Sequence, residues 1–120
     1  MSFFKKKTSI NEFEYKQIIN SISYLCIKLN YSLEVKNKAI EIVKDVVKKN
    51  ILSDKPAENA AAAVYISYFF LFGAKELDEV SNQELERKIA QIAGITEDAF
   101  KQQYIKIAET VNFEIILPSS

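Results

Sequence analysis

The chain has 120 residues, 48% of them hydrophobic, with 16 basic and 16 acidic side chains, no His, one Cys and two Gly. This leaves room for a single domain and excludes a disordered chain, an intrachain disulfide, a Cys/His zinc site, a His-dependent catalytic device and a glycine-rich phosphate loop. The composition predicts a small, mostly helical, intracellular protein, cytoplasmic in a prokaryote or virus-infected cell and nuclear in a eukaryote, that is not an enzyme and needs no cofactor.

Two amphipathic helices are predicted in the first half, after a flexible tail over residues 1–11. Residues 12–30 place apolar side chains at steps of three and four, and Cys26 lies on that stripe as a small buried hydrophobe. Residues 32–49 form the second helix, which Ser32 can cap. The lysines of this segment lie away from its apolar stripe, where a solvated surface and a phosphate-binding surface are both open interpretations: Lys36, Lys38, Lys44, Lys48 and Lys49.

The third predicted helix, residues 57–73, begins after Pro56, which suits a first helical turn. Four alanines, 60–63, are followed by a run of aromatic and aliphatic residues, so this helix is apolar on almost every side. A helix of that kind must be enclosed by others. Its most apolar window, 60–72, is too short to span a bilayer. Gly73 is the predicted C-cap.

An acidic connection is expected over 74–81, and two further helices follow it. Ser81 and Glu84 have the spacing of a capping box at the start of the fourth helix, which ends at Gly94. Thr96 then caps the fifth helix. The sequence therefore predicts a bundle of five helices with the third in the middle.

The last two helices have the pattern of a helix-turn-helix. Ala90 permits a close crossing, Gly94 makes the tight turn, and Phe100 fills the crossing. Such a unit can place its second helix in the major groove of DNA, where Lys101, Gln102 and Gln103 would lie closest to the bases. The acidic residues at the start of this helix, Glu97 and Asp98, repel phosphates. A purely structural role for the two helices, in which they only complete the bundle, stays an alternative.

Two segments resemble the cyclin-like repeats of transcription factor IIB and its archaeal counterpart, transcription factor B. The resemblance covers roughly residues 15–112. Its first part lies in the second and third helices, in the residues Val35, Lys36, Lys38, Ala39, Lys55, Ala61, Ala62, Ala63, Val64 and Tyr65. Its second part lies in the helix-turn-helix, in Ile89, Ala90, Ala93, Gly94, Ile95, Thr96, Glu97, Lys101, Gln103 and Tyr104.

This resemblance implies an all-α, five-helix cyclin-like bundle over residues 12–112, with a central apolar third helix, a C-terminal helix-turn-helix and a tail over 113–120. It also implies docking to TATA-binding protein or another transcription component, and to duplex DNA, with no membrane and no small-molecule substrate. The expected DNA-binding residues are Lys36, Lys38, Lys44, Lys48, Lys49, Lys55, Lys101, Gln102 and Gln103. The expected protein-binding residues are Glu76, Asp78, Glu79, Glu84 and Glu86.

The charge distribution keeps a second function open. Residues 1–55 carry 11 basic and 6 acidic side chains, whereas residues 56–120 carry 5 basic and 10 acidic ones, so the candidate recognition helix lies in the acidic half. The alternative is a cyclin-fold protein-interaction module that binds no DNA and acts as an adaptor or competitor of the initiation machinery. A cyclin that activates a kinase is a weaker third interpretation, since the resemblance is closer to the initiation-factor repeats.

Overall fold

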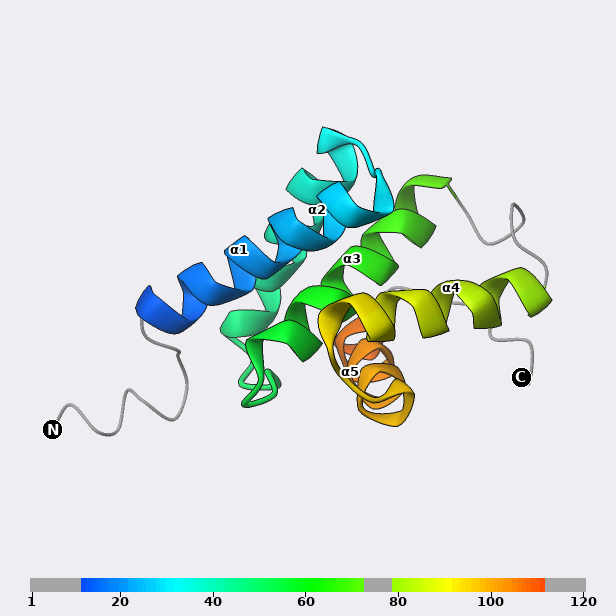
Figure 1. Ribbon diagram of the computed structural model, residues 1–120. Coiled ribbons are helices and arrows are strands. Elements are labelled where there is room, and N and C mark those ends of the chain that lie inside the picture. The colour runs from blue at the N-terminus through cyan, green and yellow to red at the C-terminus, as the bar shows by residue number, and fades with distance from the viewer. Residues whose placement is uncertain (1–11, 73–78, 112–120) are drawn as a thin grey trace, which may run out of the picture.

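Helix α3 lies at the centre of the fold, and the other helices pack around it (Figure 1). The computed structural model describes residues 12–72 and 79–111, with the side chains of 79–82 excepted. These residues form only helices, with no strand among them. The five are α1 (Glu12–Leu29), α2 (Leu33–Val47), α3 (Pro56–Phe72), α4 (Glu79–Ala93) and α5 (Glu97–Thr110).

The composition of α3 explains its position. Every residue from Asn59 to Ser67 is buried, so the helix has no solvent-facing side along this stretch. The alanines at 60–63 let neighbouring helices approach closely, and α3 contacts all four of the others. Burying apolar surface on all sides of one helix stabilises the bundle at about 25 cal/mol per Å². The predicted five-helix bundle with an enclosed third helix is confirmed.

Backbone geometry fixes the end of α1, where the connection to α2 begins. Asn30 adopts the left-handed conformation with φ of 59°, and the N–H of Tyr31 donates to the Cys26 carbonyl oxygen at 2.8 Å. This pattern ends a helix by satisfying its last carbonyl groups. The Tyr31 ring then stacks on Tyr68 of α3, with ring centroids 4.7 Å apart. Ser32 occupies the N-cap position of α2, but its side chain makes no capping hydrogen bond.

The start of α4 differs from the prediction. The helix begins at Glu79, so Ser81 lies inside its first turn and the predicted capping box is wrong. Carboxylates are favourable at a helix N-terminus, which lets the acidic segment before Ser81 enter the helix. The predicted C-cap at Gly73 lies outside the described residues.

The turn between α4 and α5 follows the prediction closely. Gly94 has φ of 73°, and the N–H of Ile95 donates to the Ala90 carbonyl oxygen at 3.0 Å. Thr96 Oγ1 then accepts a hydrogen bond from the N–H of Ala99 at 3.1 Å and caps α5. Ala90 and Phe100 are both buried, as their expected places in the crossing require.

Replacing Gly94 by Ala is expected to lower the free energy of unfolding by about 1 kcal/mol. A Cβ at this position would meet no atom within 4 Å, so the cost comes from the left-handed backbone and not from a clash. Chemical denaturation of the variant measures it. Gln91→Ala, an exposed change in the last turn of α4, is the control. Equal stability of the two variants would contradict this account.

No helix among the described residues combines the length and the apolar character needed to cross a bilayer. The same part of the chain contains no group of acidic or Cys side chains arranged to hold a metal ion.

Candidate nucleic-acid and protein interface

Four of the candidate DNA-binding lysines form an exposed basic segment at the end of α2 and in the connection to α3. Lys44, Lys48, Lys49 and Lys55 are all exposed there. Lys48 and Lys49 line a surface depression of about 350 Å³, and Thr110 and Val111 at the end of α5 line its other side. Asp45 also lines it, so the depression is of mixed charge. All four of these lysines are open to solvent.

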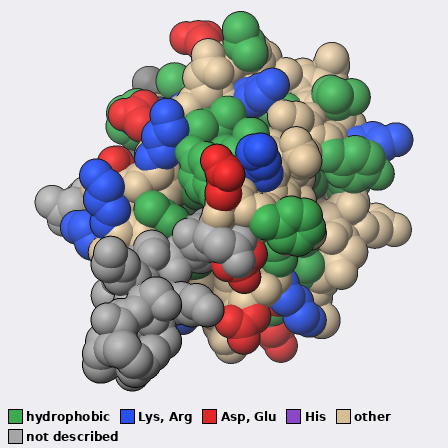
Figure 2. All heavy atoms as spheres, turned by 90° about the vertical axis from the view of Figure 1, so that its left-hand side faces the viewer, with side chains coloured by type: hydrophobic (Ala, Val, Ile, Leu, Met, Phe, Trp, Pro, Cys, Tyr) green, Lys and Arg blue, Asp and Glu red, His purple; other side chains and the backbone are tan. Residues whose placement is uncertain are grey.

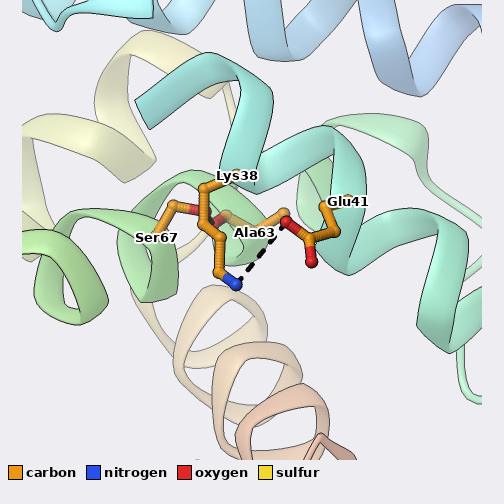
Figure 3. A network of polar contacts seen from close by, with 4 residues as sticks. All are labelled: Lys38, Glu41, Ala63 and Ser67. Carbon is orange, nitrogen blue, oxygen red and sulfur yellow. Dashed lines mark hydrogen bonds and ion pairs between the residues drawn. The ribbon is translucent and has the colours of Figure 1, made fainter. Parts of the chain in front are cut away.

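Lys38 is held differently, between α2 and α3. Its Nζ lies 3.6 Å from Glu41 Oε1 and 4.0 Å from the centroid of the Phe70 ring. Figure 3 shows the Lys38 side chain with its partner Glu41, and also Ser67 of α3, whose hydroxyl donates to the Ala63 carbonyl oxygen at 2.7 Å. A lysine with two partners of its own gives up those contacts if it turns toward a phosphate.

Lys36 lies half-exposed on α2 and acts on the buried thiol of Cys26. Burial raises the pKa of Cys26, and the positive charge of Lys36 offsets part of that shift. The thiol is therefore protonated near neutral pH, which agrees with the prediction that Cys26 is a small core hydrophobe. It is 4% exposed.

The candidate recognition helix presents two of its three predicted residues. Lys101 and Gln102 are exposed on α5, whereas Gln103 is 4% exposed. The Nε2 of Gln103 donates to the Ile51 carbonyl oxygen at 3.1 Å and to Asn59 Oδ1 at 2.9 Å. The prediction that Gln103 is available to a DNA base is therefore wrong, because the side chain points into the bundle.

Asn59 links Gln103 to the α2–α3 connection. Its Oδ1 accepts the N–H of Ser53 at 2.9 Å as well as the Gln103 amide, and its Nδ2 donates to the Ser53 carbonyl oxygen at 2.9 Å. The Ser53 hydroxyl in turn donates to Glu58 Oε1 at 2.6 Å. Asn59 is 1% exposed, and these bonds occupy its Oδ1 and one of its two Nδ2 hydrogens and hold the basic connection against α3 and α5.

Glu86 also lies differently from the prediction. A protein-binding residue needs an exposed side chain, but Glu86 is half-buried, with partners on α3 and α5. Its Oε2 accepts the hydroxyl of Tyr65 at 2.8 Å and that of Tyr104 at 2.9 Å. Helical periodicity explains this, because Glu86 lies three residues before the buried Ile89 and on the same side of α4.

The two tyrosines are held in their neutral form. Burial is the largest cause that raises the pKa of Tyr65 and Tyr104, and the negative charge of Glu86 raises both further. Each hydroxyl therefore keeps its proton and remains a donor to the carboxylate. The rings pack at a centroid distance of 4.6 Å, and Phe100 lies 5.2 Å from Tyr65. This cluster fixes the helix-turn-helix on α3.

Of the remaining acidic candidates, only Glu84 has a described side chain. Glu84 is exposed. Glu79 is the first residue of α4, but its side chain lies outside the described part of the chain. The whole of Glu76 and Asp78 lies outside it as well. At the start of α5, Glu97 lies 3.7 Å from Arg87 of α4 in an exposed ion pair. Pairs of this kind contribute little to stability.

Figure 2 shows lysine, carboxylate and hydrophobic side chains interspersed across the side of the molecule that it presents. The structure brings Gln103 to the connection that carries Lys55, and it brings the end of α5 to Lys48 and Lys49. Lys48 and Lys49 thus lie beside the end of α5, whereas Lys101 and Gln102 lie nearer its beginning.

Comparison with known proteins identifies relatives over most of the chain. Residues 12–110 match the model of the transcription factor TFIIB repeat. The chain is 34% identical over 97 residues to a transcription initiation factor IIB of Archaeoglobus fulgidus, which covers 80% of this chain and 27% of the relative. It is 33% identical over 100 residues to that of Methanothrix thermoacetophila, covering 82% of this chain and 27% of the relative.

A third relative, transcription initiation factor IIB 1 of Thermoplasma volcanium, is 30% identical over 95 residues, covering 78% of this chain and 28% of the relative. The chain therefore spans only about a quarter of the length of these relatives. No solved structure matches it. The names of these three relatives describe transcription initiation factors and not enzymes. From the match over residues 12–110, we conclude that the chain belongs to the transcription factor TFIIB repeat family.

Proposed function

We propose that this chain is a docking module in transcription initiation or its regulation, and that it contacts TATA-binding protein, promoter DNA or both. The observation that carries the proposal is the family match over residues 12–110. The exposed lysines 44, 48, 49 and 55 support a phosphate contact. Lys101 and Gln102 offer a second contact on the candidate recognition helix. The mechanism is binding and involves no chemical step.

The buried position of Gln103 favours the alternative function, an adaptor or competitor that binds a transcription component without DNA. Base reading through α5 would rest on Lys101 and Gln102, close to the exposed carboxylates Glu97 and Asp98. Carboxylates at the approach to a phosphate backbone weaken binding. The carboxylates of α5 can instead contact a basic protein surface, and Glu84 on α4 can do the same.

Affinity for duplex DNA, measured across salt concentrations with and without TATA-binding protein, tests the two functions. Each phosphate contact contributes about 0.9 to the slope of log affinity against log salt, so Lys44→Ala with Lys48→Ala should flatten the slope by about 2. Lys16→Ala with Lys28→Ala, two lysines on α1, is the matched control and should leave the slope unchanged. Binding to TATA-binding protein with no DNA binding at low salt would establish the alternative, and binding to neither would contradict both.

A further inference from the structure

The connection between α2 and α3, residues 48–55, has no helix of its own, so its course depends on bonds to other parts of the molecule. Its lysines, Lys48, Lys49 and Lys55, have exposed side chains. An irregular segment that is loose in the free protein loses conformational freedom when it binds a ligand in one shape, and that loss weakens binding. The bonds that hold this connection in the free chain therefore bear on every contact that its lysines make.

Two buried amide side chains hold the middle of the connection. The Nε2 of Gln103 on α5 donates to the Ile51 carbonyl oxygen at 3.1 Å. Asn59 on α3 binds the backbone N–H and the carbonyl oxygen of Ser53, both at 2.9 Å. Asn59 Oδ1 also accepts from Gln103 Nε2 at 2.9 Å, so the two amides act as one unit. Both are buried, which strengthens these bonds because water has little access to them.

The same hold extends to the backbone of the lysines. The Ser53 hydroxyl accepts the N–H of Lys55 at 2.9 Å and donates to Glu58 Oε1 at 2.6 Å. The Lys55 carbonyl oxygen accepts the N–H of Glu58 at 3.0 Å, at the start of α3. At the other end of the connection, the N–H of Lys49 donates to the Val46 carbonyl oxygen at 2.9 Å. The backbone of both lysines is thus fixed in the free chain, while their side chains stay exposed.

We propose that Asn59 and Gln103 are positioning residues for phosphate binding. They hold the connection in the shape in which Lys49 and Lys55 meet a chain of phosphate groups, such as a nucleic-acid backbone. Neither amide touches the ligand, because both are buried. Their effect is to remove the ordering cost that a loose connection would add to binding. This role rests on the phosphate contact of the proposed function and adds to the stability that the same bonds provide.

The test measures the affinity of the full chain for a labelled duplex DNA across salt concentrations by fluorescence anisotropy. Gln103→Leu and Asn59→Ala should each weaken binding about fivefold at a fixed salt concentration. The slope of log affinity against log salt should stay as in the parent chain, since the same lysines release the same counterions. Lys49→Ala with Lys55→Ala should instead flatten that slope by about 2.

Two further variants separate positioning from a general loss of stability. Ile22→Ala leaves a cavity in the core at α1, which carries none of these lysines, and should bind DNA as the parent chain does. Ser53→Ala loses only the hydroxyl's bonds and keeps the backbone bonds to Asn59, so it should weaken binding by less than Asn59→Ala. Circular dichroism should show that each variant is folded at the assay temperature. The Ser53 amide should exchange its hydrogen faster in Asn59→Ala than in Ile22→Ala.

The same measurements with inorganic polyphosphate distinguish a failure of this role from a failure of the proposed function. A chain that binds polyphosphate and no DNA, and loses affinity in Gln103→Leu and Asn59→Ala, would support the positioning role and contradict the DNA contact.

Four results would overturn the positioning role. The first is parent-like affinity in both amide variants, which would mean that a loose connection adapts to the phosphates at no cost. The second is an equal loss of affinity in Ile22→Ala. The third is a loss in Gln103→Leu that is confined to one DNA sequence, which would mean that Gln103 reads a base. The fourth is binding of neither DNA nor polyphosphate by the parent chain.

Discussion

Replacing Asn59 by Ala should lower the free energy of unfolding by about 3 kcal/mol. The change removes the three hydrogen bonds of a side chain that is 1% exposed, each with a net contribution of about 1 kcal/mol. It also leaves the backbone N–H and carbonyl group of Ser53 without these partners. Urea denaturation followed by circular dichroism measures the loss.

The matched control is Asn20→Ala, at an exposed asparagine in the middle of α1. Its stability should stay within about 0.5 kcal/mol of the parent. Gln103→Leu should cost less than Asn59→Ala, and the two changes together should cost less than their sum, because the residues share one hydrogen bond. Full additivity would show that Asn59 and Gln103 are not coupled. An Asn59→Ala variant as stable as the control would show that the hydrogen bonds of Asn59 contribute nothing to stability.

Replacing Glu86 by Ala should cost about 2 kcal/mol and loosen the helix-turn-helix before the rest of the molecule. The tyrosine hydroxyls at 65 and 104 would lose their shared charged acceptor. Because Glu86 is half-buried, water can replace part of what is lost, and this keeps the expected cost below that of a fully buried pair. Hydrogen exchange should show faster opening of α4 and α5 than of α1 and α2.

Two variants separate this network from a general effect of removing charge. Glu84→Ala removes an exposed carboxylate from the same helix and should change stability by less than about 0.5 kcal/mol. In a chain that carries Tyr65→Phe and Tyr104→Phe, the further change Glu86→Ala should cost much less than it does alone. Two results would contradict the proposed role of Glu86 in holding α4 and α5 on α3. One is uniform hydrogen exchange across all helices, and the other is the same cost of Glu86→Ala with and without the two tyrosine changes.

The helical architecture could be predicted from the sequence because its signals are local. The apolar character of α3 on every side requires neighbours around it, and Gly94 and Thr96 mark the turn between the last two helices. The start of α4 could not be placed as well. Ser81 and Glu84 match a capping box, but the preceding residues Glu79 and Val80 are compatible with a helix too.

The candidate site was harder to predict from the sequence, because its buried residues bond to partners that are far away along the chain. Glu86 bonds to residues 21 and 18 positions away, and no local pattern announces those bonds. Gln103 could have been identified, since it lies three residues after Phe100 and four before Ile107, on the buried side of α5. Lys101 and Gln102 fall outside that stripe, and both are exposed as the pattern requires.

The central position of α3 has a consequence for folding during synthesis. Helices α1 and α2 precede α3 in the chain, so they can pack on it as soon as it is made. The side of α3 that carries Tyr65 must wait for Phe100 and Tyr104. At about 5 to 20 residues per second, the roughly 40 residues between Tyr65 and Tyr104 take about 2 to 8 seconds to synthesise. For that interval the nascent chain exposes an aromatic surface, and a chaperone that binds such surfaces would find it there.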